Sequence, residues 1–193
     1  MENIILPEIN TQNSLKWEYI IIHHSETSAH TIQTWNGIKA YHMSWRYNDD
    51  IVTEEKAKEL IAQGKTVLPP DRDIAYNFGV QSDDNLTNFK YLIGRPLSIS
   101  GAHCLGFNAK GIGICSLENW DMHMPTHETY DAIAVLVNKL INVFNISIEN
   151  VIGHRESYDL LNVPRKKQCP GSNFDMVYLR RLIRSNIVDQ FNV

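Results

Sequence analysis

Residues 17–24, WEYIIIHH, are the stretch that most limits how this chain can fold. The run is largely apolar and contains consecutive β-branched residues, which is typical of a central strand buried on both faces. It ends in His23 and His24. Because side chains alternate along a strand, only one of these histidines can point toward a given site, and the sequence alone does not show which.

A second short apolar run, near the other end of the chain, also ends in a histidine. Residues 151–154, VIGH, lead into a polar loop that ends in Lys167, Cys169 and Pro170. The residue before a proline favours extended conformations, which predicts that Cys169 lies on a rigid loop. Lys167 is expected to favour the thiolate form of Cys169. Imidazole and thiolate groups bind Zn²⁺ well, but the spacing matches no short zinc motif, so an inert cysteine is the alternative.

Strand and helix patterns interleave along the rest of the chain. The expected elements are a helix at 31–45, a hairpin with strands at 73–81 and 88–94 around a turn at 82–86, an irregular loop at 94–110, a strand at 112–117, a helix from Thr126 to about Asn145, and a last helix capped by Asp175. This order predicts an α/β fold with a mixed central β-sheet of about five strands and helices on both faces.

The chain is expected to form a single domain over residues 1–193, with an N-terminal arm at 1–16 and a polar surface insertion at 46–72. Within the insertion, Thr53 is placed to cap a short helix, and Gly64 would lie just past its end. The insertion is either a solvated decoration or one wall of a groove.

Charge and hydropathy exclude several classes of partner. The 193 residues carry a net charge of −4, without the basic excess that nucleic-acid binding requires. No apolar run is long enough to span a bilayer, and the N-terminus lacks the features of a secretory signal peptide. Three cysteines do not suggest a disulfide framework. We therefore expect synthesis in the cytoplasm, with no nucleic-acid or membrane-spanning role.

Two imidazoles from different strand ends and one thiolate would form a three-ligand zinc site whose fourth position is left for water, as in catalytic zinc sites. Amide hydrolysis also needs a cation or donor near the oxyanion and a proton route to the leaving nitrogen. Lys167 and Tyr76 are chemically suited to these tasks, although the pattern alone favours a core position for Tyr76. His42, on the apolar stripe of the first expected helix, is predicted to be half-buried and not a ligand.

Several motifs occur together in one order: IIHHSET, DIAYNFGV, GRPLSISGAH, N-x-x-G-I-G-I and GHRE followed by K-x-C-P-G. In this, residues 17–185 resemble the zinc N-acetylmuramoyl-L-alanine amidases, in particular the phage lysozyme-type amidases and the peptidoglycan recognition proteins. The resemblance implies a mixed sheet with flanking helices. It also implies cleavage of the amide bond between the lactyl group of N-acetylmuramic acid and the L-alanine of the stem peptide.

The resemblance assigns the zinc ligands residue by residue. The family's first ligand is the histidine directly after the apolar strand, which corresponds to His23, and the second corresponds to His154 in GHRE. The third corresponds to Cys169 before Pro170, at a position where many relatives have aspartate. One zinc ion per chain is therefore implied.

The resemblance also implies roles around the zinc. Tyr76 would hydrogen-bond the attacking water or the tetrahedral intermediate, and Lys167 would stabilise the oxyanion. His103 and Asn108 match a loop motif that lines the substrate groove in relatives. They are expected to bind substrate or to support the metal ligands, and a purely loop-structural role is the alternative.

Two features depart from the family pattern: Asn77 replaces a histidine, and the insertion at 46–72 replaces a short link. The implied partner is peptidoglycan or its muropeptide fragments, bound by a monomer that acts on the cell wall after release. The alternatives are a cytoplasmic amidase that recycles soluble muropeptides and a non-catalytic peptidoglycan-binding module. Non-catalytic relatives typically lack the ligand cysteine, whereas Cys169 is present here.

Overall fold

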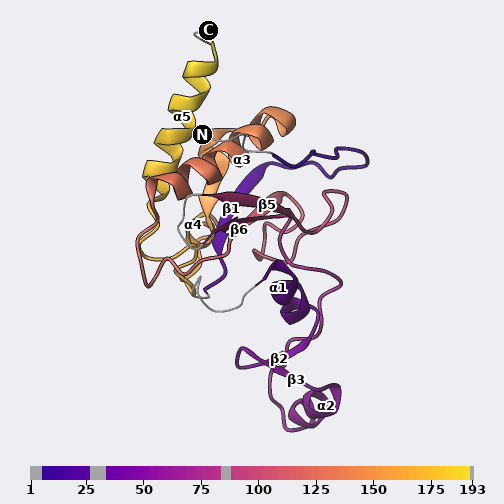
Figure 1. Ribbon diagram of the computed structural model, residues 1–193. Coiled ribbons are helices and arrows are strands. Elements are labelled where there is room, and N and C mark those ends of the chain that lie inside the picture. Colours follow the sequence, from indigo (N-terminus) through magenta and orange to yellow (C-terminus); the bar gives the residue numbers. More distant parts are fainter. Residues whose placement is uncertain (1–5, 27–33, 84–87, 192–193) are drawn as a thin grey trace.

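The computed structural model describes residues 6–26, 34–83 and 88–191 (Figure 1). Its elements are β1 (Tyr19–His24), α1 (Trp35–His42), β2 (Trp45–Tyr47), β3 (Asp50–Val52), α2 (Glu54–Ala62), β4 (Phe78–Ser82), β5 (Phe89–Ile93), β6 (Gly111–Ser116), α3 (His127–Phe144), a 3₁₀ turn η1 (Ile148–Asn150), β7 (Val151–Gly153), α4 (His154–Leu160) and α5 (Met176–Phe191). Among the described residues, no helix has the length and apolar character needed to cross a membrane.

A five-stranded mixed sheet forms the centre of the fold, in the order β5-β4-β6-β1-β7. β1 lies between β6 and β7 and runs parallel to both, β4 runs parallel to β6, and the edge strand β5 is antiparallel to β4. The three consecutive isoleucines of β1, residues 20–22, are fully buried. The predictions of a central strand covered on both faces and of a mixed sheet are therefore confirmed.

Alternation along β1 separates a packing face from a second face. Ile20 and Ile22 point into the main core, where α3 and α5 pack on the sheet, whereas Ile21 belongs to a smaller cluster on the opposite face. His23 has the parity of Ile21, so its side chain emerges on the face away from α3 and α5. This parity distinguishes the two neighbouring histidines.

The two helices of the packing face begin at the predicted caps. Thr126 Oγ1 accepts a hydrogen bond from the backbone N–H three residues later (3.2 Å), and α3 ends at Asn145, which adopts the left-handed conformation (φ 52°). Asp175 Oδ1 accepts hydrogen bonds from the second and third N–H groups of α5 (2.8 and 3.0 Å). Such caps satisfy N–H groups that have no partner within the helix.

The opposite face is covered by α1, α4 and the loop at 94–110. Trp35 of α1 lies against Gly79 of β4, where a Cβ atom would come within 2.7 Å of the indole ring. Cys104 and Phe107 of the loop pack against β1 and β7. Loops and short helices therefore cover this face of the sheet, whereas the long helices α3 and α5 pack on the opposite face.

Helix α4 occupies a stretch that the sequence led us to expect as loop, so that prediction is wrong. The Glu156 carboxylate accepts a hydrogen bond from the backbone N–H of Gly153 (2.8 Å) and stabilises the first turn. With 7 residues, α4 is too short for a helical periodicity to be recognised in the sequence.

Two other boundaries differ from the expected ones. The strand expected at 73–81 begins only at Phe78, because residues 73–77 form an irregular segment. The turn expected at 82–86 and the start of the helix expected at 31–45 extend into residues outside the described part of the chain. Among the described residues this helix is α1, which begins after the cap Thr34 and ends at His42, short of the expected residue 45, because Trp45 begins β2.

The insertion at 46–72 projects from the body of the molecule, at the bottom of Figure 1. Its helix α2 is capped as predicted: Thr53 Oγ1 accepts a backbone N–H (3.2 Å), and Gly64 follows the helix with φ +75°. The hairpin of β2 and β3 was not predicted. Asn48 and Asp49 both have positive φ (50° and 66°), as in a type I′ turn, but three-residue strands are too short to show alternation.

The base of the insertion is closed by backbone hydrogen bonds. The N–H of Asp71 donates to the carbonyl of His42 (2.9 Å), and Arg46 and Leu68 exchange a pair of hydrogen bonds (3.0 and 2.9 Å). Both ends of the insertion thus meet beside the C-terminus of α1.

Candidate metal centre and cleft

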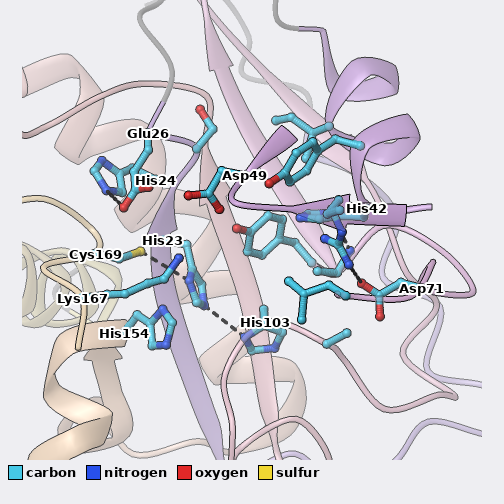
Figure 2. A pocket seen from close by; sticks show the side chains of 18 of the residues that line it. His23, His24, Glu26, His42, Asp49, Asp71, His103, His154, Lys167 and Cys169 are labelled. Carbon is cyan, nitrogen blue, oxygen red and sulfur yellow. Dashed lines mark hydrogen bonds and ion pairs between the residues drawn. The ribbon is translucent and has the colours of Figure 1, made fainter. Parts of the chain in front are cut away.

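Strand register brings the two predicted histidine ligands together. β1 and β7 are parallel neighbours, with Ile22 opposite Gly153, so His23 and His154 follow at adjacent strand ends. Their ring centroids are 4.8 Å apart. With Cys169 they form a group whose potential ligand atoms all lie within 4.8 Å of one another (Figure 2).

The third member of this group has the spacing that zinc requires. Cys169 Sγ lies 3.5 Å from His23 Nδ1. Tetrahedral zinc, with Zn–S about 2.3 Å and Zn–N about 2.0–2.1 Å, separates two such atoms by about 3.6 Å. The His24 backbone N–H also donates to the Cys169 sulfur, a contact that favours the thiolate. The residues therefore fit one zinc ion, in agreement with the donor types.

The Cys169 loop is positioned by an arginine that sequence reasoning missed. The Arg155 backbone N–H donates to the carbonyl of Cys169 (2.7 Å). Its guanidinium donates to the carbonyls of Gln168 (3.2 Å), Gly171 and Phe174 (2.6 Å). Arg155 therefore fixes the loop on both sides of the ligand cysteine. The sequence feature that could have indicated Arg155 is its position directly after His154 in the GHRE motif.

Burial sets the protonation of the ligands. Burial, then the neighbouring His154, holds the pKa of His23 well below its ordinary value, and burial followed by Lys167 lowers that of His154 to about 4. Both rings therefore have a nitrogen lone pair at neutral pH. Burial raises the pKa of Cys169 to about 12 and outweighs the opposing effect of Lys167. Lys167 therefore favours the thiolate, as predicted, but burial has the larger effect and keeps the thiol protonated without a bound metal.

Tyr76 lies beside the ligand group, on the irregular segment that precedes β4. Its ring centroid is 5.0 Å from that of His23. Burial raises the pKa of Tyr76 well above its ordinary value, so its hydroxyl stays protonated. The segment is held by Arg95, whose guanidinium donates to the carbonyls of Asp73, Ile74 and Ser100 (2.9 Å each). Sequence reasoning missed this arginine.

Lys167 borders the same cleft from the loop before Cys169. Its side chain is exposed, and Figure 2 shows it directed toward the ligand group between Cys169 and His154. Burial and then the positive charge of Lys167 lower the pKa of His154, and the pKa of Glu26 is lowered by its hydrogen bond with His24 and less strongly by Lys167. This places a cation at the entrance to the metal centre.

His103 and Asn108 have different surroundings. His103 is buried, and its Nδ1 lies 3.0 Å from His23 Nε2. Asn108 is not among the residues that line the described cleft. Its Oδ1 accepts hydrogen bonds from the backbone N–H groups of His103 and Cys104 (2.8 Å each). Asn108 thus stabilises the loop, which is the alternative role considered for it.

The cleft has a volume of about 650 Å³ and extends from the ligand group to the insertion. Arg46, Asp49, Leu68, Pro69 and Asp71 of the insertion line its far wall. Arg46 Nη2 donates to Asp71 Oδ2 (3.1 Å) and the Pro69 carbonyl (3.3 Å), which attaches this wall to β2. The insertion is therefore one wall of the cleft and not only a solvated decoration.

Two further histidines line the cleft. His42 is half-buried, and its Nδ1 accepts a hydrogen bond from the Ala75 N–H (3.2 Å), so Nε2 holds the hydrogen. Burial lowers the pKa of His42 to about 4. His24 lies near Glu26 and Asp121 (3.8 Å each), but its Nδ1 accepts from the Trp120 N–H (3.1 Å). His24 Nε2 therefore has a hydrogen and no lone pair for a metal.

The sequence matches the profile of the Amidase_2 family, described as N-acetylmuramoyl-L-alanine amidase, over residues 13–172. It is 28% identical to peptidoglycan-recognition protein LB of Drosophila melanogaster over 156 residues, which are 79% of this chain and 54% of that protein. It is 26% identical to peptidoglycan-recognition protein SC2 of Drosophila simulans over 164 residues, 80% of this chain and 68% of that protein. The chain thus spans about half the length of the first relative.

Solved structures share the fold. The endolysin amidase LysCS from Clostridium intestinale has a TM-score of 0.61 and 21% identity, with 89% of this chain and 86% of the other covered. Drosophila peptidoglycan-recognition protein LB has a TM-score of 0.53 and 23% identity, with 89% and 81% covered. Because the family profile spans most of the sequence, the chain belongs to the Amidase_2 family of N-acetylmuramoyl-L-alanine amidases.

Proposed function

We propose that this protein is a zinc-dependent amidase that cleaves the bond between the lactyl group of N-acetylmuramic acid and the L-alanine of peptidoglycan stem peptides. The observation that carries the proposal is the ligand group of His23, His154 and Cys169, which opens into a cleft lined by Tyr76 and Lys167. Three protein ligands and one open position are the arrangement of catalytic zinc sites.

When bound, zinc supplies a Lewis acid that polarises a carbonyl and lowers the pKa of a water molecule to about 7. His23 and His154 would hold it through neutral rings, and Cys169 would hold it as a thiolate. Burial of His23 and Cys169, which are 1% and 4% exposed, keeps competing water away from these ligand atoms.

Tyr76 and Lys167 act on the amide. The protonated hydroxyl of Tyr76 donates a hydrogen bond to the attacking water or to the tetrahedral intermediate. The ammonium group of Lys167 stabilises the negative charge that develops on the carbonyl oxygen. His42, which lines the cleft beside Tyr76 and has its hydrogen on Nε2, is suited to hold a carbonyl of the stem peptide.

The partner is peptidoglycan or a soluble muropeptide, bound along the cleft between the metal centre and the insertion. A point mutant of Drosophila peptidoglycan-recognition protein LB, which shares the fold, has been solved in complex with tracheal cytotoxin (TM-score 0.51, 21% identity). The competing function is a binding module without turnover, which is favoured by the recognition proteins among the curated relatives. The retained and positioned Cys169 favours the enzyme.

Purified protein should be assayed for zinc content and for release of stem peptides from sacculi and from soluble muropeptides, before and after chelation. We expect one zinc per chain and chelator-sensitive release of peptides that begin with L-alanine. Zinc together with binding but no release would identify a binding module. Release from soluble fragments alone would identify a recycling amidase. Chelator-insensitive release or no zinc would exclude the proposed mechanism.

A further inference from the structure

The ring of His103 occupies a narrow slot on the second face of the sheet. A Cβ atom on Gly101 or on Gly113 would come within 2.6 Å of this ring. The slot therefore requires glycine on both sides, and it fixes the plane of the imidazole. Asn108 holds the backbone of the same loop through the N–H of His103 (2.8 Å). The orientation of His103 is thus built into the loop and into β6.

His103 links a metal ligand to the backbone of β6. Its Nε2 lies 3.1 Å from the carbonyl oxygen of Gly111, and its Nδ1 lies 3.0 Å from Nε2 of His23. The contact between the two rings is drawn as a dashed line in Figure 2. The rings meet edge to face, at an interplanar angle of 82°.

The carbonyl of Gly111, at the end of this series of hydrogen bonds, determines which ring nitrogens of His103 and His23 hold a hydrogen. A carbonyl oxygen can only accept, so Nε2 of His103 must hold a hydrogen and donate it to Gly111. In the neutral ring, Nδ1 of His103 is then an acceptor, and Nε2 of His23 must donate to it. The remaining nitrogen of His23, Nδ1, keeps its lone pair and faces Cys169 Sγ at 3.5 Å.

We propose that His103 is a positioning residue of the metal centre, which fixes the tautomer and the ring orientation of His23 for binding zinc through Nδ1. The proposal rests on the proposed function only in requiring a zinc ion. Of the two expected roles of His103, it selects support of a metal ligand over substrate binding, because both ring nitrogens are engaged within the protein.

The neutral imidazole of His103, as the hydrogen-bond partner of His23, also affects the Lewis acidity of a bound zinc ion. Metal-bound histidines commonly donate their second N–H to a carboxylate or a carbonyl, and a carboxylate raises the basicity of the ligand. Here the partner is a neutral imidazole whose own hydrogen goes to a backbone carbonyl. No negative charge is added behind His23, so the zinc keeps more of its Lewis acidity.

The test uses the full chain with His103→Ala and His103→Asn. Alanine removes the acceptor for His23, whereas the asparagine Oδ1 can occupy the place of Nδ1. We expect His103→Ala to weaken zinc binding about 10- to 100-fold in chelator competition, the range usual for such partners, and His103→Asn to restore most of it. Unfolding of the metal-free variants shows whether the protein is still folded. A zinc affinity of folded His103→Ala equal to that of the wild type would overturn the proposal.

A second readout is independent of zinc. In the metal-free wild type with ¹⁵N-labelled histidine, NMR should show His23 protonated at Nε2, and His103→Ala should populate the other tautomer. Protonation of wild-type His23 at Nδ1 would contradict the proposal. Neither readout uses hydrolysis. A wild type that binds zinc without cleaving peptidoglycan therefore refutes the function alone, and a wild type that binds no zinc refutes both.

Discussion

At the scale of single residues, Cys169 would contribute the one anionic ligand of the proposed zinc site. Removing its sulfur leaves only two imidazoles, which bind zinc weakly. We expect Cys169→Ala to lose both zinc and hydrolysis while remaining folded, measured as metal content after gel filtration and as peptide release. Cys104 is also buried and lies outside the ligand group, so Cys104→Ala should retain one zinc. Full zinc occupancy in Cys169→Ala would contradict the ligand assignment.

The protonated state of Cys169 predicts a pH dependence of zinc binding. With its pKa raised to about 12, the thiol is neutral at pH 7, whereas His154, with a pKa of about 4, is already deprotonated. Zinc must displace one proton, so its apparent affinity should rise about tenfold per pH unit between about pH 6 and 9. Calorimetry in buffers of different ionisation enthalpy should report one proton released. A pH-independent affinity would show that Cys169 is already a thiolate.

Lys167 provides a test of the oxyanion role. We expect Lys167→Ala to lower kcat about 10²-fold, the lower end of the range for such donors, because its side chain is exposed. Zinc content should not change, since Lys167 is not a ligand. Lys166 is exposed and is not among the cleft-lining residues, so Lys166→Ala is the matched control. Equal kcat values for the two variants would exclude the proposed role.

The sequence located the candidate ligands because two of them end apolar runs and the third precedes a proline. The residue pattern alone could not choose between His23 and His24, because that choice depends on which face of β1 carries α3 and α5, and only the family resemblance indicated His23. Arg95 and Arg155 were missed for a different reason. Their guanidinium groups bind backbone carbonyls brought together by the fold, and no residue pattern in the sequence marks such acceptors.

At the scale of elements, the insertion gives a prediction about substrate binding. Arg46 attaches the far wall of the cleft through Asp71 and the Pro69 carbonyl. Arg46→Met should raise KM roughly tenfold, as expected for the loss of one or two hydrogen bonds, with kcat and zinc content little changed. Thr53→Ala is the control: it removes the cap of α2 in the same insertion, but Thr53 does not line the cleft. An unchanged KM in Arg46→Met would separate this wall from substrate binding.

Capped and strongly periodic elements were predictable from local chemistry. α2 and α3 begin at threonines whose hydroxyl groups accept backbone hydrogen bonds, and such residues are visible in the sequence. α4, β2 and β3 were not predicted, because each is too short to show a period. Their stability depends on contacts beyond the element, such as the Arg180 pairing with Glu156 (2.9 Å) that ties α4 to α5.

At the scale of the whole molecule, the proposed metal ligands join segments that are distant in sequence. His23 ends β1, whereas His154 and Cys169 flank α4 and the loop after it. Zinc that binds only the folded state should therefore raise the free energy of unfolding by about 2.7 kcal/mol at a concentration one hundred times its Kd. The main core does not include the ligands, so the metal-free chain should still fold. Denaturant unfolding with and without chelator measures both the stabilisation by zinc and the stability of the metal-free chain. Equal free energies of unfolding in the two conditions would exclude a zinc site in the folded state.

The fold class followed from the sequence because a strand buried on both faces requires layers on both sides of a sheet. The order of the strands did not follow, because pairing of β1 with β6 and β7 joins segments about 90 and 130 residues apart and leaves no local pattern in the sequence. The direction of β5, by contrast, followed from its hairpin with β4.

The closed base of the insertion means that the whole segment can be replaced as a unit. Its two ends meet where Asp71 bonds to His42, so a loop of different length or composition can replace it without moving the strands that carry the zinc ligands. Protein engineers could therefore graft alternative loops at this junction to change what the cleft binds. The length and composition of the insertion can therefore vary independently of the strands that position His23 and His154.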